Sequence, residues 1–229
     1  MERIKDNLER VKERMAEAAL RSGRSPDSVR LVAVSKTVEA DRIREAIEAG
    51  VKILGENRVQ EAERKISLLG RDVEWHLVGH LQTNKAKVAV SLFDLIHSLD
   101  SVHLAQVLDR QGEKQGKVVP VLVEVNLARE ESKSGVAAEE LEGLLLAISS
   151  LQHLEVQGLM AIPPFCEKPE SVRPYFRRLR TLAEEVSRLR IPNVRMEHLS
   201  MGMSHDFEIA IEEGATMVRV GTAIFGPRG

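Results

Sequence analysis

Lys36 stands directly after the apolar run of residues 31–35, where a buried strand is expected to leave the protein core. An ammonium group at the rim of an apolar core is partly desolvated, and desolvation favours the neutral, nucleophilic amine. Such an amine can form a Schiff base with an aldehyde or a ketone. A single strand-end lysine more often extends into solvent, so the reactive interpretation of Lys36 depends on other residues of the chain.

Two segments near the end of the sequence carry groups that suit a phosphate. Residues 200–204, Ser-Met-Gly-Met-Ser, supply hydroxyl groups, a flexible glycine and N–H groups at the start of a helix. Arg219, Gly221 and Thr222 bring a cation, a close-approach glycine and a hydroxyl within four residues. Since both segments lie at the C-terminal ends of predicted strands, they could together cradle a phosphate dianion.

Two residues of these segments have structural alternatives. Ser204 is predicted to be the N-cap of the next helix, with Asp206 and Glu208 in its first turn. Because these carboxylates would repel a phosphate, the anion is expected at residues 200–203. Arg219 could form an ion pair on the outside of the sheet or face a ligand inside, and the sequence leaves both interpretations open.

Polar residues after other predicted strands have ordinary explanations as well. Asn57 with Gln60 can cap a helix, and His205 is expected to be a solvent or capping residue rather than a general base. His76 and His80 are four residues apart, but this spacing does not converge on a strand, so no metal site is predicted.

Helical and strand patterns alternate along the whole sequence. The predicted strands are near-continuous apolar runs, as expected for a parallel sheet that is covered on both faces. We predict eight strands, at residues 29–35, 51–55, 74–78, 95–98, 118–125, 154–160, 195–200 and 217–220. Helices are predicted at residues 2–22, 40–49, 58–69, 84–91, 101–115, 137–150, 171–190 and 206–213.

This alternation predicts an α/β fold, a (β/α)8 TIM barrel, rather than an open doubly wound sheet. No low-complexity linker interrupts the pattern, so residues 1–229 are predicted to form a single domain. The tail 223–229 is too short and too rich in glycine and proline for a closing helix. We therefore expect the additional N-terminal helix to cover part of the barrel. The active site of such barrels lies at the C-terminal ends of the strands, where the phosphate-compatible segments are predicted.

The composition excludes several classes of partner. A net charge of -2 gives no electrostatic reason to expect nucleic acid or an anionic membrane. The N-terminus lacks the apolar core of a signal peptide, and the single cysteine, Cys166, excludes an internal disulfide and suits a reducing compartment. A cytoplasmic location is expected, and a monomer, since no apolar stripe stands out beyond those that cover the barrel.

Five motifs in order resemble the pyridoxal phosphate homeostasis protein family, which is similar to the barrel domain of alanine racemase standing alone. The resemblance spans nearly the whole chain. The motifs are Val-Ala-Val-Ser-Lys-Thr at 32–37, Gly-Glu-Asn-Arg-Val-Gln-Glu at 55–61, His-Leu-Val-Gly-His-Leu-Gln-Thr-Asn-Lys at 76–85, Leu-Ser-Met-Gly-Met-Ser-His-Asp at 199–206 and Arg-Val-Gly-Thr-Ala-Ile-Phe-Gly at 219–226.

The resemblance implies pyridoxal 5'-phosphate as cofactor, joined through its aldehyde to Lys36. It further implies that Arg219 faces the pyridine nitrogen and that Asn57 lies beside the ring or its hydroxyl. The phosphate would be held by the side chains or backbone of Ser200, Met201, Gly202, Gly221 and Thr222.

Three functions remain open at this point. A carrier would hold the cofactor reversibly for vitamin B6 homeostasis and pass it to apo-enzymes, with little or no catalysis. An amino-acid racemase would use Lys36 as a base, and a Schiff-base aldolase would act on a phosphorylated sugar. We expect the carrier, because Arg219 weakens the ring as an electron sink and no second, tyrosine-bearing domain is expected after Gly229. The single tyrosine, Tyr175, is predicted to lie on an outer helix.

Overall fold

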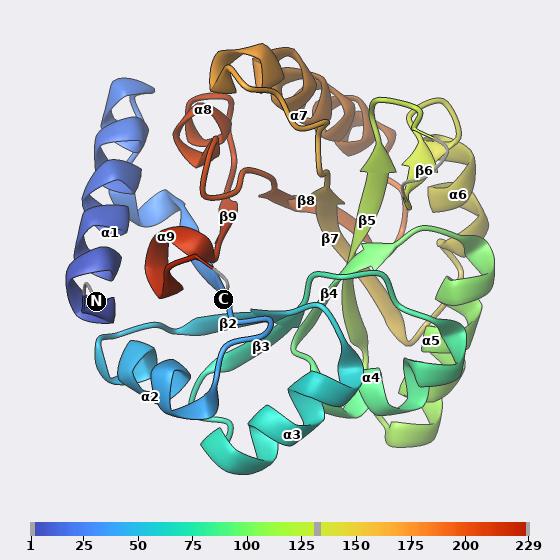
Figure 1. Cartoon of the computed structure of the whole chain (residues 1–229). Helices are drawn as coiled ribbons and strands as arrows, with labels where there is room; N and C mark the ends of the chain where they lie inside the picture. Colours follow the sequence, from blue (N-terminus) through green and yellow to red (C-terminus); the bar gives the residue numbers. More distant parts are fainter. Residues whose placement is uncertain (1–2, 131–133, 228–229) are drawn as a thin grey trace.

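Eight parallel strands close into a barrel (Figure 1). The computed structural model describes residues 3–130 and 134–227. Neighbouring strands pair in parallel from the first to the last, and β1 pairs with β9 to complete the ring. The barrel strands are β1 (Arg30–Val34), β2 (Ile53–Glu56), β3 (Glu74–Leu77), β4 (Leu95–Leu99), β5 (Val119–Asn126), β7 (Leu154–Met160), β8 (Val194–Ser200) and β9 (Met217–Val220). The predicted (β/α)8 barrel is confirmed.

The short strand β6 (Val136–Ala137) was not predicted, and it pairs with the end of β5 beside the barrel. Two residues are too few to produce a period that a sequence could reveal. The helix predicted over 137–150 accordingly begins later, as α6 (Leu141–Ile148).

The other helices lie around the outside of the barrel (Figure 1). Residue 2, where the first helix was predicted to begin, lies outside the described residues. The helices are α1 (Ile4–Arg21), α2 (Ala40–Glu48), α3 (Val59–Leu69), α4 (Ala86–Leu92), α5 (Val102–Gln115), α7 (Arg173–Leu189), α8 (Phe207–Glu212) and α9 (Thr222–Phe225), with short 3-10 turns η1 (Pro26–Ser28), η2 (Thr83–Lys85) and η3 (Pro169–Val172).

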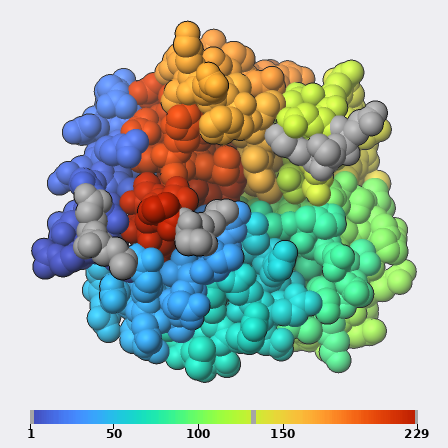
Figure 2. All heavy atoms as spheres, viewed as in Figure 1, coloured from blue at the N-terminus to red at the C-terminus, as the bar shows by residue number. Residues whose placement is uncertain are grey.

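Helix α1 covers part of the barrel, as the sequence predicted, and it lies where the last strand meets the first. Figure 2 shows this N-terminal segment, in blue, against the C-terminal segment in red. Its buried face includes Leu8 and Val11, and the amide of Asn7 donates a 3.0 Å hydrogen bond to the backbone oxygen of Ile224 in α9. Because α9 is a single turn, α1 supplies the apolar cover that a longer closing helix would give.

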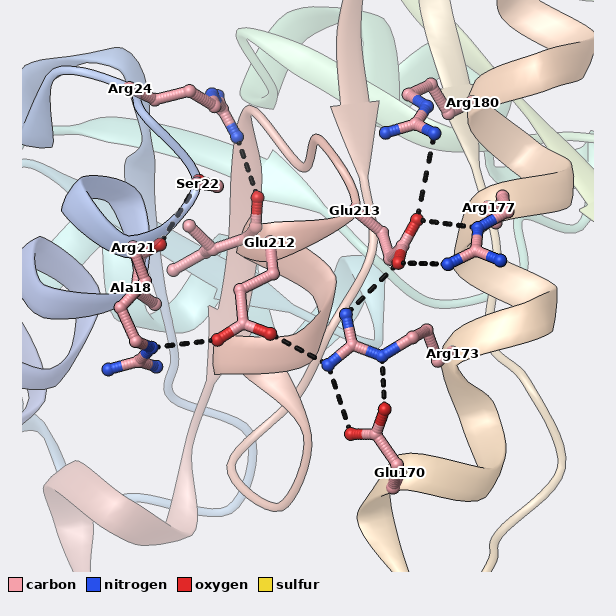
Figure 3. A network of polar contacts seen from close by, with 11 residues as sticks. Ala18, Arg21, Ser22, Arg24, Glu170, Arg173, Arg177, Arg180, Glu212 and Glu213 are labelled. Atoms are coloured by element: carbon pink, nitrogen blue, oxygen red, sulfur yellow. Dashed lines mark hydrogen bonds and ion pairs between the residues drawn. The ribbon is translucent and has the colours of Figure 1, made fainter.

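An ion-pair network fixes α8 and the turn before β9 between α1 and α7 (Figure 3). The buried carboxylate of Glu213 lies 3.1 Å from Arg173 and 2.9 Å from Arg177. Glu212 pairs with Arg173 at 2.7 Å on one side and with Arg21 of α1 at 2.9 Å on the other. The network therefore anchors the segment that leads into the last barrel strand.

The interior of the barrel is apolar in one part and polar in another. Its polar side chains include His76, His97 and Arg219. Its apolar cluster, against which Val34 packs, consists of Val32, Ile53, Val78, Leu95, Leu122, Met160 and Met217.

Candidate functional site

A cavity of about 440 Å³ opens at the C-terminal ends of the strands. This is the end at which barrels of this type carry their active sites. Residues from both ends of the chain meet there, because β1 lies between β2 and β9. Polar side chains that line it include Lys36, Asn57, Glu124, Ser204, Arg219 and Thr222.

The backbone on both sides of Lys36 is held from outside the barrel. Thr37 has a φ of 62°, a conformation that costs a β-branched residue roughly 1–3 kcal/mol. Its N–H donates a 2.6 Å hydrogen bond to Oε1 of Glu61, on helix α3. On the other side, the backbone oxygen of Ser35 accepts a 2.6 Å hydrogen bond from the buried ammonium of Lys65. These contacts fix the path of the chain through Lys36.

Lys65, Glu56 and Glu61 form one buried charge cluster, which we call the Lys65 clamp. The Lys65 ammonium lies 2.8 Å from Glu56 and 2.7 Å from Glu61. The hydroxyl of Ser35 donates to the same Glu56 oxygen at 2.6 Å. Burial raises the pKa of Glu56 although Lys65 and Ser35 oppose the rise, and within the described residues its Oε2 atom has no hydrogen-bond partner. Glu56 and Glu61, from the motif at 55–61, thus help to hold the backbone beside Lys36, the lysine of the motif at 32–37.

Arg219 points into the barrel, which decides between its two interpretations in favour of an interior cation. The side chain is 4% exposed and lines the cavity. It donates to the hydroxyl of Ser200 at 2.6 Å and to the backbone oxygen of Ala161 at 2.9 Å. Burial lowers the pKa of Arg219 to about 10, against the opposing charges of Glu124 and Asp206. A cation bonded to two neutral oxygens therefore faces the cavity.

The hydroxyl of Ser204 accepts hydrogen bonds from the backbone N–H groups of Gly221 and Ala223, each at 3.3 Å. The prediction that Ser204 caps the next helix is wrong. Helix α8 begins at Phe207, and Asp206 closes the preceding turn by accepting from the Met203 N–H at 2.6 Å. Ser204 therefore does not cap α8, and its side chain lines the cavity instead.

Gly221 permits the close approach of β9 to β1 beside the cavity. A Cβ atom at this position would lie 3.1 Å from the backbone oxygen of Val34. Thr222 follows as the first residue of α9 and lines the cavity. Gly221 therefore supplies one of the two N–H groups that donate to Ser204, and Thr222 lies between it and the other, Ala223.

The other residues predicted for the phosphate lie deeper in the protein. Ser200 is fully buried and bonds to His97 and Arg219, whereas Met201 donates its N–H to the backbone of Met217 at 3.1 Å. Gly202 has a φ of +89°, and a Cβ atom there would lie 2.5 Å from Ala210. From this segment, Met203, Ser204 and His205 line the cavity. Phosphate binding by Ser200, Met201 and Gly202 stays a prediction.

The cavity also contains groups that the sequence reasoning did not assign. Glu124 is an acid within the otherwise apolar strand β5, and burial raises the pKa of this side chain although Arg219 opposes the rise. His80 lies 3.2 Å from the hydroxyl of Ser134 and 3.3 Å from Asp100. A charged residue inside an apolar strand was the signal that could have identified Glu124. Asn57, which was predicted, lines the cavity beside Gly79.

Comparisons with known proteins identify the family of this chain. Residues 1–229 match the family model described as the alanine racemase N-terminal domain. A pyridoxal phosphate homeostasis protein of Aquifex aeolicus is 50% identical over 224 residues, which are 97% of each chain. PipY of Synechococcus elongatus, solved with PLP bound, has a TM-score of 0.83 and 43% identity, covering 94% of this chain and 100% of PipY.

A more distant structure supports the fold alone. An alanine racemase of Clostridium difficile has a TM-score of 0.76 at 14% identity, covering 99% of this chain and 57% of the racemase. Among the described residues, no helix combines the length and the apolar character that crossing a membrane requires.

Proposed function

Because this chain belongs to the alanine racemase N-terminal domain family, and within it to the pyridoxal phosphate homeostasis proteins, we propose that it holds pyridoxal 5'-phosphate reversibly on Lys36. The observation that carries the proposal is that three kinds of group meet at one cavity. These are Lys36, next to the backbone that Lys65 holds, the buried guanidinium of Arg219, and the N–H groups of Gly221 and Ala223 that point at Ser204. Pyridoxal phosphate supplies an aldehyde that an amine attacks reversibly and a ring that can withdraw electrons.

The phosphate would bind beside Ser204. The N–H groups of Gly221 and Ala223 lie 3.3 Å from its hydroxyl, a distance longer than the usual 2.9–3.0 Å. A phosphate oxygen in their reach would accept shorter, charge-assisted bonds from the same donors. The hydroxyls of Ser204 and Thr222 would add to this cradle, and Ser200, Met201 and Gly202 would support it from below.

The ring would then lie between this cradle and Lys36. Arg219 would face the pyridine nitrogen, and Asn57 would lie beside the ring or its hydroxyl. A guanidinium opposite the ring nitrogen disfavours protonation of that nitrogen, which weakens the ring as an electron sink. This electrostatic argument favours a carrier for intracellular vitamin B6 homeostasis, with apo-enzymes as recipients, over a catalyst.

An amino-acid racemase is the second candidate, favoured by the match to the racemase family model. Lys36 would then remove a proton from the substrate. The single tyrosine of the chain, Tyr175, lies on α7 and is half-buried on the outside of the barrel, so it offers no opposing base at the cavity.

Borohydride reduction of the purified protein, followed by peptide mapping, tests the proposal. We expect a pyridoxyl adduct at Lys36 in the parent protein and in the control Lys85→Ala, and none in Lys36→Ala. A protein that forms no Schiff base with added cofactor contradicts both candidates. Solvent deuterium entry at the Cα of amino acids separates them, because rapid exchange that depends on Lys36 would favour the racemase.

A further inference from the structure

We propose that Arg219 is positioned by a hydrogen-bond chain that crosses the barrel interior from the cavity to the exposed Glu74 at its opposite end, and that His97 and His76 are positioning residues for the cofactor site. The chain continues through the side chains of Ser200, His97, His76 and Glu74. The inference rests on the proposed function only for its effect on the bound cofactor.

The contacts are continuous. The guanidinium of Arg219 lies 2.6 Å from the hydroxyl of Ser200, which lies 2.9 Å from Nδ1 of His97. Nε2 of His97 lies 3.0 Å from Nδ1 of His76, and Nε2 of His76 lies 3.2 Å from Oε2 of Glu74. Arg219, Ser200, His97 and His76 come from four different strands and meet inside the barrel, whereas Glu74 lies two residues before His76 at the exposed start of β3.

The two charged ends fix the direction of every hydrogen bond. A guanidinium only donates, so the oxygen of Ser200 accepts from Arg219; in the direction that Glu74 requires, the Ser200 hydroxyl gives its own proton to Nδ1 of His97. His97 then carries its proton on Nε2 and donates to Nδ1 of His76. Nε2 of His76 in turn donates to the carboxylate of Glu74, which can only accept when ionised.

The reverse direction is excluded by the carboxylate. If His97 donated to Ser200 from Nδ1, its Nε2 would accept from His76, and Nε2 of His76 would carry no proton. Two hydrogen-bond acceptors, Nε2 of His76 and the Glu74 carboxylate, would then face each other at 3.2 Å without a proton between them, which is unfavourable. Glu74 therefore sets the tautomers of both histidines.

Burial keeps both imidazoles neutral between the charged ends. It lowers the pKa of His97 well below its ordinary value, and the nearby His76 and Arg219 lower it further. Burial also lowers the pKa of His76, although Glu74 opposes this. Glu74 itself stays ionised, since the bond from His76 and the pair with Arg30, at 2.6 Å, lower its pKa to about 2.

The chain makes Ser200 a stronger acceptor for Arg219, because aligned hydrogen bonds polarise one another in a low-dielectric interior. Arg219 is thereby directed at the cavity with its charge retained. Ser200 acquires a role as the link between Arg219 and the histidines. If the chain is broken, Arg219 loses its orientation, and the ring of a bound cofactor loses the cation beside it.

Nitrogen-15 NMR of the histidine rings in the unmodified protein at pH 7 tests the chain without any cofactor. We expect His97 and His76 to be neutral with the proton on Nε2 in each. A proton on Nδ1 of His97, or a charged ring at either position, would overturn the proposal. Since no substitution is needed, failure to fold cannot confuse this result.

The positioning role is tested on the cofactor-loaded protein with His97→Leu, which breaks the chain, and His97→Asn, whose Oδ1 can still accept from Ser200. We expect His97→Leu to shift the absorption maximum of the bound cofactor in the direction that Arg219→Lys does and to raise its Kd roughly tenfold, as loss of a bond to a charged group would. His97→Asn should restore most of both, and His103→Asn, on the exposed face of α5, should change neither.

An unchanged spectrum and affinity in His97→Leu would overturn the positioning role even if the NMR tautomers agree. Absence of any cofactor adduct at Lys36 in the parent protein would instead refute the proposed function, and the ring NMR would still decide on the chain.

Discussion

The ammonium of Lys65 donates a 2.6 Å hydrogen bond to the backbone oxygen of Ser35, the residue directly before Lys36. A buried lysine thus positions the cavity lysine from the opposite side of the sheet. The contact explains why one acid ends β2 and another lies in the first turn of α3, since Glu56 and Glu61 neutralise this buried cation.

Replacing Lys65 should both destabilise the protein and slow its reaction with the aldehyde. Lys65→Met leaves the buried carboxylate of Glu56 uncompensated, and we expect a loss of about 3–5 kcal/mol in the free energy of unfolding. Denaturant unfolding measures this loss, and absorbance after addition of pyridoxal phosphate measures the reaction rate. Adding Glu56→Gln should recover part of the stability, whereas Lys87→Met, at an exposed position, should have no effect. Equal rates in Lys65→Met and the parent would refute a positioning role.

Ser204 and Ser200 should respond differently to loss of their hydroxyls. Ser204→Ala removes a group beside the N–H donors, so we expect roughly tenfold weaker binding of pyridoxal phosphate and unchanged binding of pyridoxal, which lacks the phosphate. Ser200→Ala should alter the spectrum of the bound cofactor through Arg219. Equilibrium titrations with both ligands measure the difference. If Ser200→Ala lost more selectivity for pyridoxal phosphate over pyridoxal than Ser204→Ala does, the phosphate would instead bind at the deeper position, residues 200–203, that the sequence predicted.

The buried histidines should make the fold sensitive to mild acid. The folded-state pKa of His97 is lowered, so between that value and the unfolded value near 6.5 only the unfolded chain binds the proton. Stability should therefore fall as the pH falls below about 6.5, by about 1.4 kcal/mol per pH unit for this one group. Urea unfolding between pH 7 and pH 5 should show a shallower decline in His97→Asn. Parallel declines in the two proteins would contradict a neutral, buried His97.

Loss of the Glu213 carboxylate should loosen the segment before β9. Glu213→Gln removes the negative charge that the guanidinium groups of Arg173 and Arg177 share and replaces one acceptor oxygen with an amide donor, and we expect a loss of about 1–3 kcal/mol in the free energy of unfolding. Thermal unfolding measures it. Glu184→Gln is the matched control, because this exposed acid pairs with Arg180 at 3.7 Å on the surface of α7.

The barrel could be predicted because its signals are local and repeated. Apolar runs such as residues 118–125 and the helical periods between them identify each unit without its neighbours. Lys36 and Arg219 could be assigned to the same end of the barrel because the carboxyl ends of parallel strands share one edge. The short strand β6 lacked any such signal.

The polar contacts could not be predicted, because they depend on register between distant strands. Nothing near His97 in sequence indicates that its ring meets Ser200, 103 residues away. The expected cap at Ser204 failed for a related reason. The local sequence pattern predicted that Ser204 accepts from N–H groups of the following helix, whereas in the structure it accepts from those of Gly221 and Ala223, which are distant in sequence.

The pairing of β9 with β1 joins the first barrel strand to the last one. During synthesis, Lys36 therefore emerges long before the N–H groups that would hold the phosphate, and the cavity is completed only when the ring closes. A ligand bound both to Lys36, after β1, and to the N–H groups after β9 would link these two strands. Its binding free energy would therefore add directly to the free energy needed to separate β1 from β9. Hydrogen exchange in β1 and β9 should then report how much cofactor each molecule carries.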